Sequence, residues 1–151
     1  MDEAAFWNRV HQIASKATWA YLATAKGNQP KVRIVHPAFE GDRLWIATGR
    51  TSPKAAHIET NPRVELFYAV GPEMIHLTVT GRAKFIDDLA EKKRVWTSKV
   101  FDYDLAQFWP AGPESPDFGL LFVEPKKVEL TSLAEMAANK PAEVWRAPKK
   151  K

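Results

Sequence analysis

Hydrophobic and polar residues alternate most regularly between positions 75 and 85. A repeat of two residues is typical of a β-strand, because successive side chains of a strand point to opposite faces. One face carries Ile75, Leu77, Val79, Gly81, Ala83 and Phe85, and the other carries His76, Thr78, Thr80, Arg82 and Lys84. We predict that the first face lies in the core and that the second meets water, a ligand or a second subunit.

Shorter patterns predict the remaining elements. Further strands are expected over residues 19–25, 31–40, 43–48, 63–70 and 118–130, the last interrupted by Pro125. Helices are expected over residues 3–16 and 54–59, and from residues 88 and 132, where Ser or Asp precedes Glu at the spacing of a capping box. About six short strands with small flanking helices favour a mainly β fold over a doubly wound sheet. We expect an antiparallel barrel with Greek-key-like order.

Composition limits the class of protein. The 151 residues suggest one domain over positions 1–151, and 45% hydrophobic with 26% charged residues is ordinary for a soluble globular protein. The chain has no cysteine, which excludes disulfides, thiolate zinc sites and cysteine nucleophiles and fits a cytoplasmic location. Its acidic start does not resemble a secretory signal, and no apolar run is long enough to span a membrane.

The chain carries a formal net charge of +4, part of it from lysines at the carboxyl end. We expect residues 141–151 to form a flexible, solvated tail. Nucleic-acid binding is not expected, because no basic face beside stacking aromatic residues is evident. A modest positive excess suits a small molecule that bears a phosphate group.

The turn at residues 48–54 is the strongest local indication of such a ligand. Ser52 is a good N-cap and Pro53 suits the first position of the helix that follows. A helix N-terminus attracts phosphate, and Lys54, Arg50 and Thr48 stand around it. Two interpretations are open here: a cradle for a phosphate monoester, or an ordinary capped helix with solvated charges.

Several other chemistries lack their motifs. The sequence contains no G-x-S-x-G elbow, H-E-x-x-H helix, Walker A loop or G-x-G-x-x-G turn. The four histidines, at positions 11, 36, 57 and 76, do not have the spacing of metal ligands, so no metal site is expected. Binding of a preformed, phosphorylated cofactor is the interpretation that survives.

The order of segments resembles the FMN-binding split β-barrel family of pyridoxamine 5′-phosphate oxidase-like proteins. The segments are Val32-Arg33-Ile34-Val35, Trp45-Ile46-Ala47-Thr48, Ser52-Pro53-Lys54, Asn61-Pro62-Arg63-Val64, Thr80-Gly81-Arg82-Ala83 and residues 108–117. The resemblance spans residues 4–130 and is greatest to the short general-stress-protein branch. It implies a homodimer with two FMN sites at the subunit interface, and a small-molecule substrate or electron donor.

The resemblance also implies which residues hold the cofactor. Arg33, Ser52 and Lys54 match residues that bind the FMN phosphate, and Thr48 matches a hydroxyl residue at a strand end. Ile34 and Val35 match positions whose backbone follows the isoalloxazine ring. His76 stands where many relatives carry a glutamine that faces the flavin. Trp109 either covers the ring or packs in the core or dimer interface, and His36 either approaches the site or is structural.

Departures from the family pattern argue against vitamin B6 oxidation. Ala38 replaces a lysine that holds the substrate phosphate in true pyridoxamine-phosphate oxidases, and Pro53 replaces a frequent arginine. Their arginine–x–histidine pair has no counterpart after Leu130. The expected function is FMN-dependent oxidoreduction of an unidentified small molecule, with a stress-related role and no catalytic residue assigned. A non-catalytic module for flavin, deazaflavin or haem is the alternative.

Overall fold

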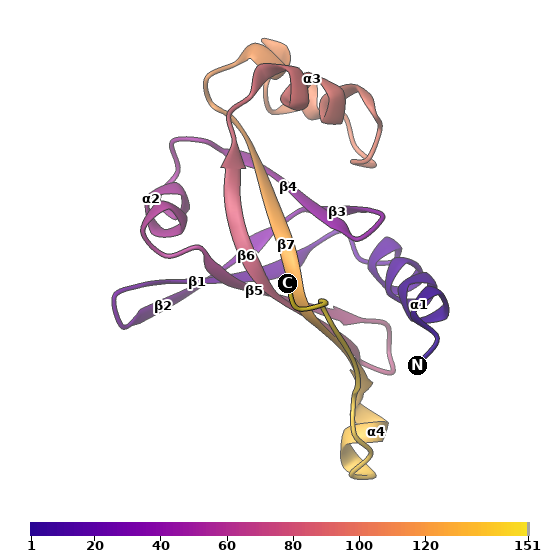
Figure 1. The fold of residues 1–151 in the computed structure, drawn as a ribbon. Helices are drawn as coiled ribbons and strands as arrows, with labels where there is room; N and C mark the ends of the chain where they lie inside the picture. Colours follow the sequence, from indigo (N-terminus) through magenta and orange to yellow (C-terminus); the bar gives the residue numbers. More distant parts are fainter. Residues whose placement is uncertain (151) are drawn as a thin grey trace.

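The computed structural model describes residues 1–150, and its strands form one antiparallel sheet (Figure 1). Seven strands follow the order β2-β1-β5-β6-β7-β4-β3, and β8 pairs with β7. Within the described residues β2 and β3, at the two ends of this order, are not paired, so the sheet is not closed into a barrel. The strands are β1 (Ala20–Lys26), β2 (Gln29–Val35), β3 (Pro37–Glu40), β4 (Arg43–Gly49), β5 (Arg63–Val70), β6 (Ile75–Ile86), β7 (Phe118–Ser132) and β8 (Glu143–Arg146).

The path of the chain confirms the mainly β, antiparallel architecture of a split barrel. After β4 the chain passes through α2 (Pro53–Thr60) and enters β5, which is three positions away from β4 in the sheet. Strand β7 later returns to lie beside β4, so β4 to β7 have Greek-key order. This crossing brings the end of β4 and the start of α2 next to the β1–β2 hairpin, where the candidate site lies.

The helices lie against different strands of the sheet. They are α1 (Glu3–Ser15), α2, α3 (Leu89–Thr97) and α4 (Leu133–Ala137), with 3-10 turns η1 (Leu105–Gln107) and η2 (Gly112–Glu114). Helix α1 contacts β3 and β6, α2 contacts β1 and β6, and α4 contacts β7. Both predicted capping boxes have their N-cap bond: Asp88 accepts from Glu91 N over 3.0 Å, and Ser132 accepts from Glu135 N over 3.2 Å. In Figure 1, α1 lies beside β3 and α3 lies beyond the ends of β6 and β7. No helix within residues 1–150 is long and apolar enough to cross a membrane.

The apolar side chains form two cores. The larger core lies within the curve of the sheet, against α1, and includes Phe6, Leu22 and Tyr68. The smaller core lies between β4, β7 and the segment that contains α3. Its buried members are Trp45, Val95, Phe101, Leu105, Trp109, Phe118 and Leu120. Each large buried apolar side chain contributes about 1.5–3 kcal/mol, so both cores fix the strands that carry the candidate site.

Two predicted boundaries near the prolines were wrong. The single strand expected over residues 31–40 is two strands, which separate at His36 before Pro37, because proline lacks the N–H that a continuous ladder requires. Pro125, in contrast, does not interrupt β7. A register shift opposite Gly81 accommodates it, and a Cβ at Gly81 would lie only 2.5 Å from the Glu124 carbonyl oxygen.

The carboxyl-terminal tail also differs from the expectation of flexibility. Residues 143–146 form β8, which pairs with β7. Trp145 is buried in the larger core, and its Nε1–H donates to Glu3 Oε1 over 2.9 Å. This hydrogen bond and the burial of the tryptophan ring anchor the segment to α1. The alternation of residues 143–146 is too short to predict a strand from the sequence.

Candidate functional site

Lys54, in the first turn of α2, points back toward the end of β4. Its Nζ donates to Thr48 Oγ1 over 2.6 Å and lies 3.4 Å from Ser52 Oγ. Ser52 occupies the N-cap position, but its side chain makes no capping hydrogen bond, so that part of the sequence prediction was wrong. The Ser52 hydroxyl instead joins Lys54 and Thr48 in one polar group at the start of the helix.

Arg33 reaches the same region from β2. In the sheet register Arg33 is opposite Leu22, so its side chain shares the inner face of the sheet with that core residue. Its Nη1 donates to Thr24 Oγ1 over 2.8 Å, and Thr24 also lies 3.4 Å from His57 Nδ1 on α2. The other terminal nitrogen, Nη2, is buried and has no hydrogen-bond partner among residues 1–150.

Arg33 and Lys54 are close enough to affect one another, and no carboxylate among residues 1–150 neutralises them. Burial, and then the nearby charge of Arg33, lower the pKa of Lys54. Burial lowers the pKa of Arg33. Neither side chain forms an ion pair with a carboxylate within the described residues. Arg33 on β2 and Lys54 on α2 are therefore two half-buried cations, and Arg33 Nη2 has no acceptor among residues 1–150. Such an arrangement can bind a multiply charged anion.

Other polar residues of the turn face away from this basic pair. Arg50 donates to Asp87 and Glu59 over 2.9 and 3.0 Å, and its guanidinium lies 4.3 Å from the Phe85 ring centroid. Thr51 donates to Asp117 Oδ1 over 2.9 Å. These contacts fix the loop between β4 and α2, so Arg50 and Thr51 are structural residues of the turn.

An apolar cavity of about 300 Å³ adjoins Thr48. Its lining comes from the segment before β1, the end of β2, the end of β4 and the loop around η1. The lining residues are Thr18, Trp19, Ile34, Val35, His36, Ala47, Thr48, Tyr103, Gln107, Phe108 and Trp109. A planar, largely apolar ring system fits such a cavity, and the basic pair lies beyond Thr48 at its edge.

Trp109 is buried in the smaller core and also lines the apolar cavity. It is 9% exposed, packs against the Phe118 ring at a centroid distance of 5.1 Å, and donates its Nε1–H to the Asp117 carbonyl over 3.1 Å. The same side chain forms a wall of the apolar cavity. Ile34 and Val35 also line that cavity, one exposed and the other buried.

His76 lies apart from Arg33 and Lys54 in the structure. It is half-buried at the start of β6, opposite Ala69 and Thr131, and its ring centroid is 5.2 Å from that of Phe67. The register places its side chain on the outer face of the sheet, the face that also carries Tyr21 and Ile34. Arg33 and Lys54 lie on the opposite side.

Sequence reasoning missed several residues of the site. Thr24 is a buried polar residue in a mostly apolar strand, and that break in the pattern is a usable signal. His57 follows Lys54 by one helical turn, and partial burial and the charges of Arg33, Lys26 and Lys31 lower its pKa. Trp19 and Tyr103 gave no local signal, because only the packing of distant segments brings them to the cavity.

Comparisons with known proteins agree with this architecture. General stress protein 26 of Bacillus subtilis (strain 168) is 26% identical over 117 residues, which cover 76% of this chain and 79% of that protein. Among solved structures, a protein from Clostridium acetobutylicum related to general stress protein 26 superposes with a TM-score of 0.77. It is 14% identical, and the alignment covers 95% of this chain and 96% of that one.

Two further solved structures of the same fold are named for the groups they bind. A pyridoxamine 5′-phosphate oxidase-related, FMN-binding protein from Nostoc punctiforme has a TM-score of 0.61 at 18% identity, with 97% of each chain covered. A haem-binding protein from Mycobacterium smegmatis has a TM-score of 0.66 at 14% identity, with 90% of this chain and 55% of that one covered. At these identities the structural likeness shows the fold alone.

The match to a family model covers most of the chain. Residues 6–132 match the model described as pyridoxamine 5′-phosphate oxidase. That range contains the smaller core, the basic pair, the apolar cavity and all of the buried residues of the larger core except Trp145. The chain therefore belongs to the pyridoxamine 5′-phosphate oxidase family.

Proposed function

We propose that this protein binds FMN and uses it as an oxidoreductase that acts on a small molecule. The observation that carries the proposal is the half-buried pair of Arg33 and Lys54, with one buried guanidinium nitrogen unpartnered and no carboxylate paired to either residue among residues 1–150. An FMN phosphate is close to a dianion at neutral pH and supplies the missing charge. When bound, FMN supplies hydride or electron transfer, which side chains do not provide.

The residues divide the work of holding the cofactor. Arg33 and Lys54 bind the phosphate by charge-assisted hydrogen bonds, with Ser52 and Thr48 as neighbouring hydroxyl groups. The cavity lined by Ile34, Val35 and Trp109 excludes water from the ring. Family membership and the FMN-binding neighbour of the same fold support this assignment.

The substrate we propose is not pyridoxamine phosphate. Ala38, on β3, stands where the resemblance implies a lysine for the substrate phosphate, and an alanine offers no charge to a second phosphate group. Pro53 likewise removes a basic residue from the phosphate turn. Similarity to a general stress protein supports a role in a stress response.

Haem or a deazaflavin is the second candidate cofactor. His36 lines the apolar cavity, and a histidine beside an apolar cavity is a possible axial ligand of haem iron. A haem-binding protein of the same fold supports this alternative. We favour FMN because Arg33 and Lys54 lie close together, as binding of a single phosphate group requires. The two carboxylates of a haem group would instead require two cations that lie apart.

We also propose that two copies pair through the outer face of the sheet. Trp19, Tyr21, Val32 and Ile34 are 47–63% exposed there, although they are large and apolar. A paired subunit would cover these side chains. His76 lies on the same outer face as Ile34. A second copy packed on this face would therefore bring its own side chains, His76 among them, to the surface that carries Ile34.

The test begins with the absorption spectrum of the purified protein and mass identification of any molecule released on denaturation. A flavin spectrum with released FMN is the expected result, whereas a Soret band would favour haem. Colourless protein after dialysis against saturating FMN would overturn the proposal. Anaerobic mixing with a reduced nicotinamide then separates a reductase, whose flavin bleaches, from a module that only binds the cofactor.

A further inference from the structure

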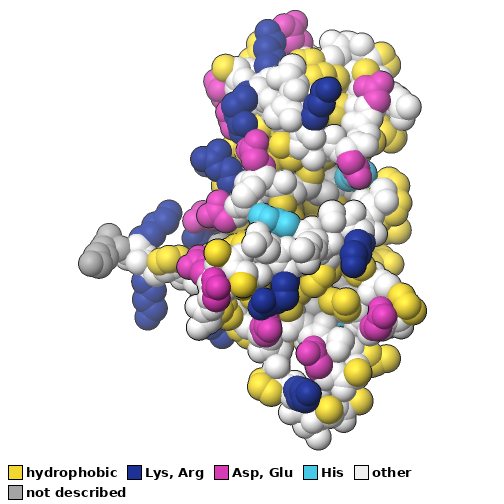
Figure 2. Space-filling view, turned by 90° about the vertical axis from the view of Figure 1, so that its right-hand side faces the viewer, with side chains coloured by type: hydrophobic (Ala, Val, Ile, Leu, Met, Phe, Trp, Pro, Cys, Tyr) yellow, Lys and Arg dark blue, Asp and Glu magenta, His cyan; other side chains and the backbone are white. Residues whose placement is uncertain are grey.

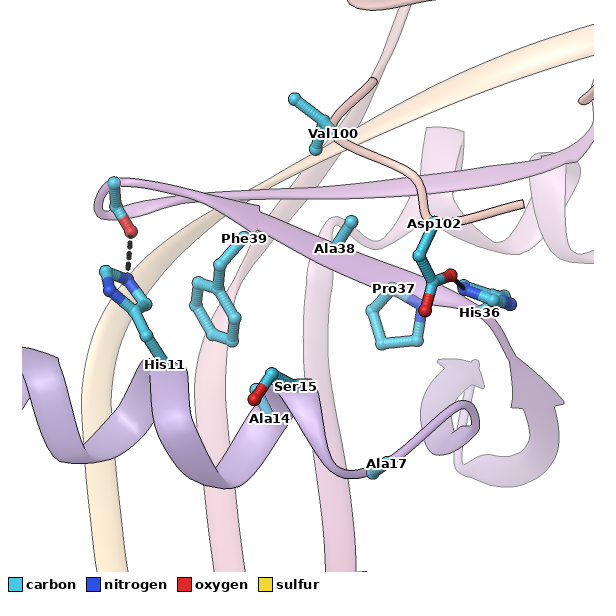
Figure 3. Close-up of a pocket in the computed structure, with 11 residues that line it drawn as sticks. His11, Ala14, Ser15, Ala17, His36, Pro37, Ala38, Phe39, Val100 and Asp102 are labelled. Atoms are coloured by element: carbon cyan, nitrogen blue, oxygen red, sulfur yellow. Dashed lines mark hydrogen bonds and ion pairs between the residues drawn. The ribbon is translucent and has the colours of Figure 1, made fainter. Parts of the chain in front are cut away.

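A second cavity, of about 320 Å³, lies on the other side of His36. Figure 3 shows its position between the end of α1, β3 and the segment that carries Val100 and Asp102. On the face shown in Figure 2, histidine side chains reach the surface between the part with α3 and the rest of the molecule. The lining residues are His11, Ala14, Ser15, Ala17, His36, Pro37, Ala38, Phe39, Gly41, Val100 and Asp102.

Asp102 sets the charge of this cavity. It is the only Asp, Glu, Lys or Arg among the eleven lining residues. One carboxylate oxygen, Oδ1, accepts from His36 Nε2 over 2.9 Å, and the Asp102 side chain is 74% exposed. Burial and, second, the charge of Asp102 raise the pKa of Tyr103 to about 12, so the carboxylate also acts on its neighbours.

The remaining polar groups leave Asp102 as the main acceptor in the cavity. His11 is already hydrogen-bonded through Nε2 to the Gly41 carbonyl over 2.7 Å, and the Ser15 hydroxyl donates to Gln12 O over 2.9 Å. The other walls are alanine, proline, valine and phenylalanine side chains. A single negative group above apolar walls favours a ligand with an apolar body and one positive group, and it repels anions. The basic pair at Arg33 and Lys54 has the opposite preference.

We propose that this second cavity binds a small organic amine, whose ammonium group pairs with Asp102 and whose apolar body lies against Pro37 and Phe39. The cavity is separate from the one assigned to the flavin ring, and nothing in its lining depends on that assignment. His36 lines both cavities. An amine held by Asp102 therefore lies one side chain away from the occupant of the neighbouring cavity, as expected of the small molecule on which the protein acts.

The experiment is a titration of FMN-free protein with benzylamine, followed through backbone amide resonances of Ala14, Ala17 and Val100. Benzyl alcohol and benzoate serve as probes with the same aromatic body and no positive charge, and both are expected to bind more weakly than benzylamine. Asp102→Asn should weaken benzylamine about 3- to 5-fold, the range expected for a solvent-screened ion pair. Asp104→Asn is the matched control, because Asp104 caps η1 and does not line the cavity.

Three results would overturn the proposal. These are equal affinity for benzyl alcohol and benzylamine, unchanged benzylamine affinity in the folded Asp102→Asn variant, and the absence of resonance shifts at the cavity residues. Because FMN is left out, failure of the flavin assignment would not change the outcome. Circular dichroism of both variants verifies that the exposed substitutions leave the fold intact.

Discussion

Arg33 and Lys54 illustrate how a binding site opposes stability at the scale of single residues. Both are partly buried cations, and burial lowers the pKa of each because the charged form loses hydration. The chain offers hydroxyl partners, Thr24 and Thr48, which satisfy hydrogen bonds without neutralising charge. An anion is therefore the partner that removes the unfavourable interaction between the two cations.

The first prediction concerns this pair. Arg33→Ala and Lys54→Ala should each weaken FMN binding by about 1.5–3 kcal/mol, the value of a hydrogen bond to a charged group. Quenching of flavin fluorescence in a titration measures the affinity. Lys31→Ala is the control, because Lys31 is on the same strand but exposed. Similar losses in all three variants would indicate a general effect of positive charge, and unchanged affinity in the first two would refute the cradle.

At the scale of elements, a network of ionic hydrogen bonds joins β3 to α3. Arg94 of α3 donates to both carboxylate oxygens of Glu40 over 3.0 and 3.1 Å, and to Glu91 within its own helix. Trp45 Nε1 also donates to Glu40 over 3.2 Å. The hydrogen bond from Arg94 is the main reason that the pKa of Glu40 is below its ordinary value of 4.5. The network holds α3 over the smaller core. The loop around η1, which lines the apolar cavity beside Thr48, also packs on this core.

The second prediction is a pH dependence of this network. A carboxyl group whose pKa is lower in the folded than in the unfolded state stabilises the fold above its ordinary pKa, and that contribution is lost as pH falls through the folded value. Glu40→Gln should therefore lower the free energy of unfolding by about 0.5–1 kcal/mol at pH 7, allowing for solvent screening. In urea denaturation the difference from the wild type should shrink as the pH falls well below 4.5.

Glu65→Gln provides the comparison for Glu40, because Glu65 is exposed on β5 and has no ion pair within residues 1–150. We expect this variant to change stability little at either pH. A Glu40→Gln effect that stays constant down to acidic pH would mean that packing, and not the ionised carboxylate, stabilises the contact with Arg94.

At the scale of the whole molecule, one sheet has two unlike faces. The inner face packs the larger core, whereas the outer face near β1 and β2 exposes a group of large apolar residues. Soluble monomers rarely leave such residues together in water. Arg33 and the exposed Ile34 are consecutive residues of β2, so their side chains point to opposite faces of the sheet. Pairing of subunits and binding of the cofactor should therefore depend on each other.

The third prediction tests this coupling. Ile34→Glu places a charge in the proposed interface and should shift sedimentation from dimer toward monomer, with weaker FMN binding. Met136→Glu is the control, since Met136 is a large apolar residue exposed on α4, away from this face. A wild-type monomer that holds FMN tightly would contradict the interface, as would an Ile34→Glu variant that stays dimeric.

The sequence by itself determined the features that depend on neighbouring residues. The alternation at residues 75–85 was sufficient for β6, and the capping residues Asp88 and Ser132 marked two helix starts. It also identified the turn before α2 as a place where Lys54 and Thr48 meet. These features are local, because strand periodicity and helix caps require only contacts within a few residues.

Only the tertiary structure decided which distant groups share a site. Greek-key crossing of the strands brings Arg33 of β2 near Lys54 of α2, with a buried guanidinium nitrogen that has no partner among residues 1–150, and it leaves His76 on the other face. It also places Asp102 against His36, 66 residues away, and inserts Trp145 into the core. No local pattern encodes these contacts, because they depend on the register and order in which the whole sheet pairs.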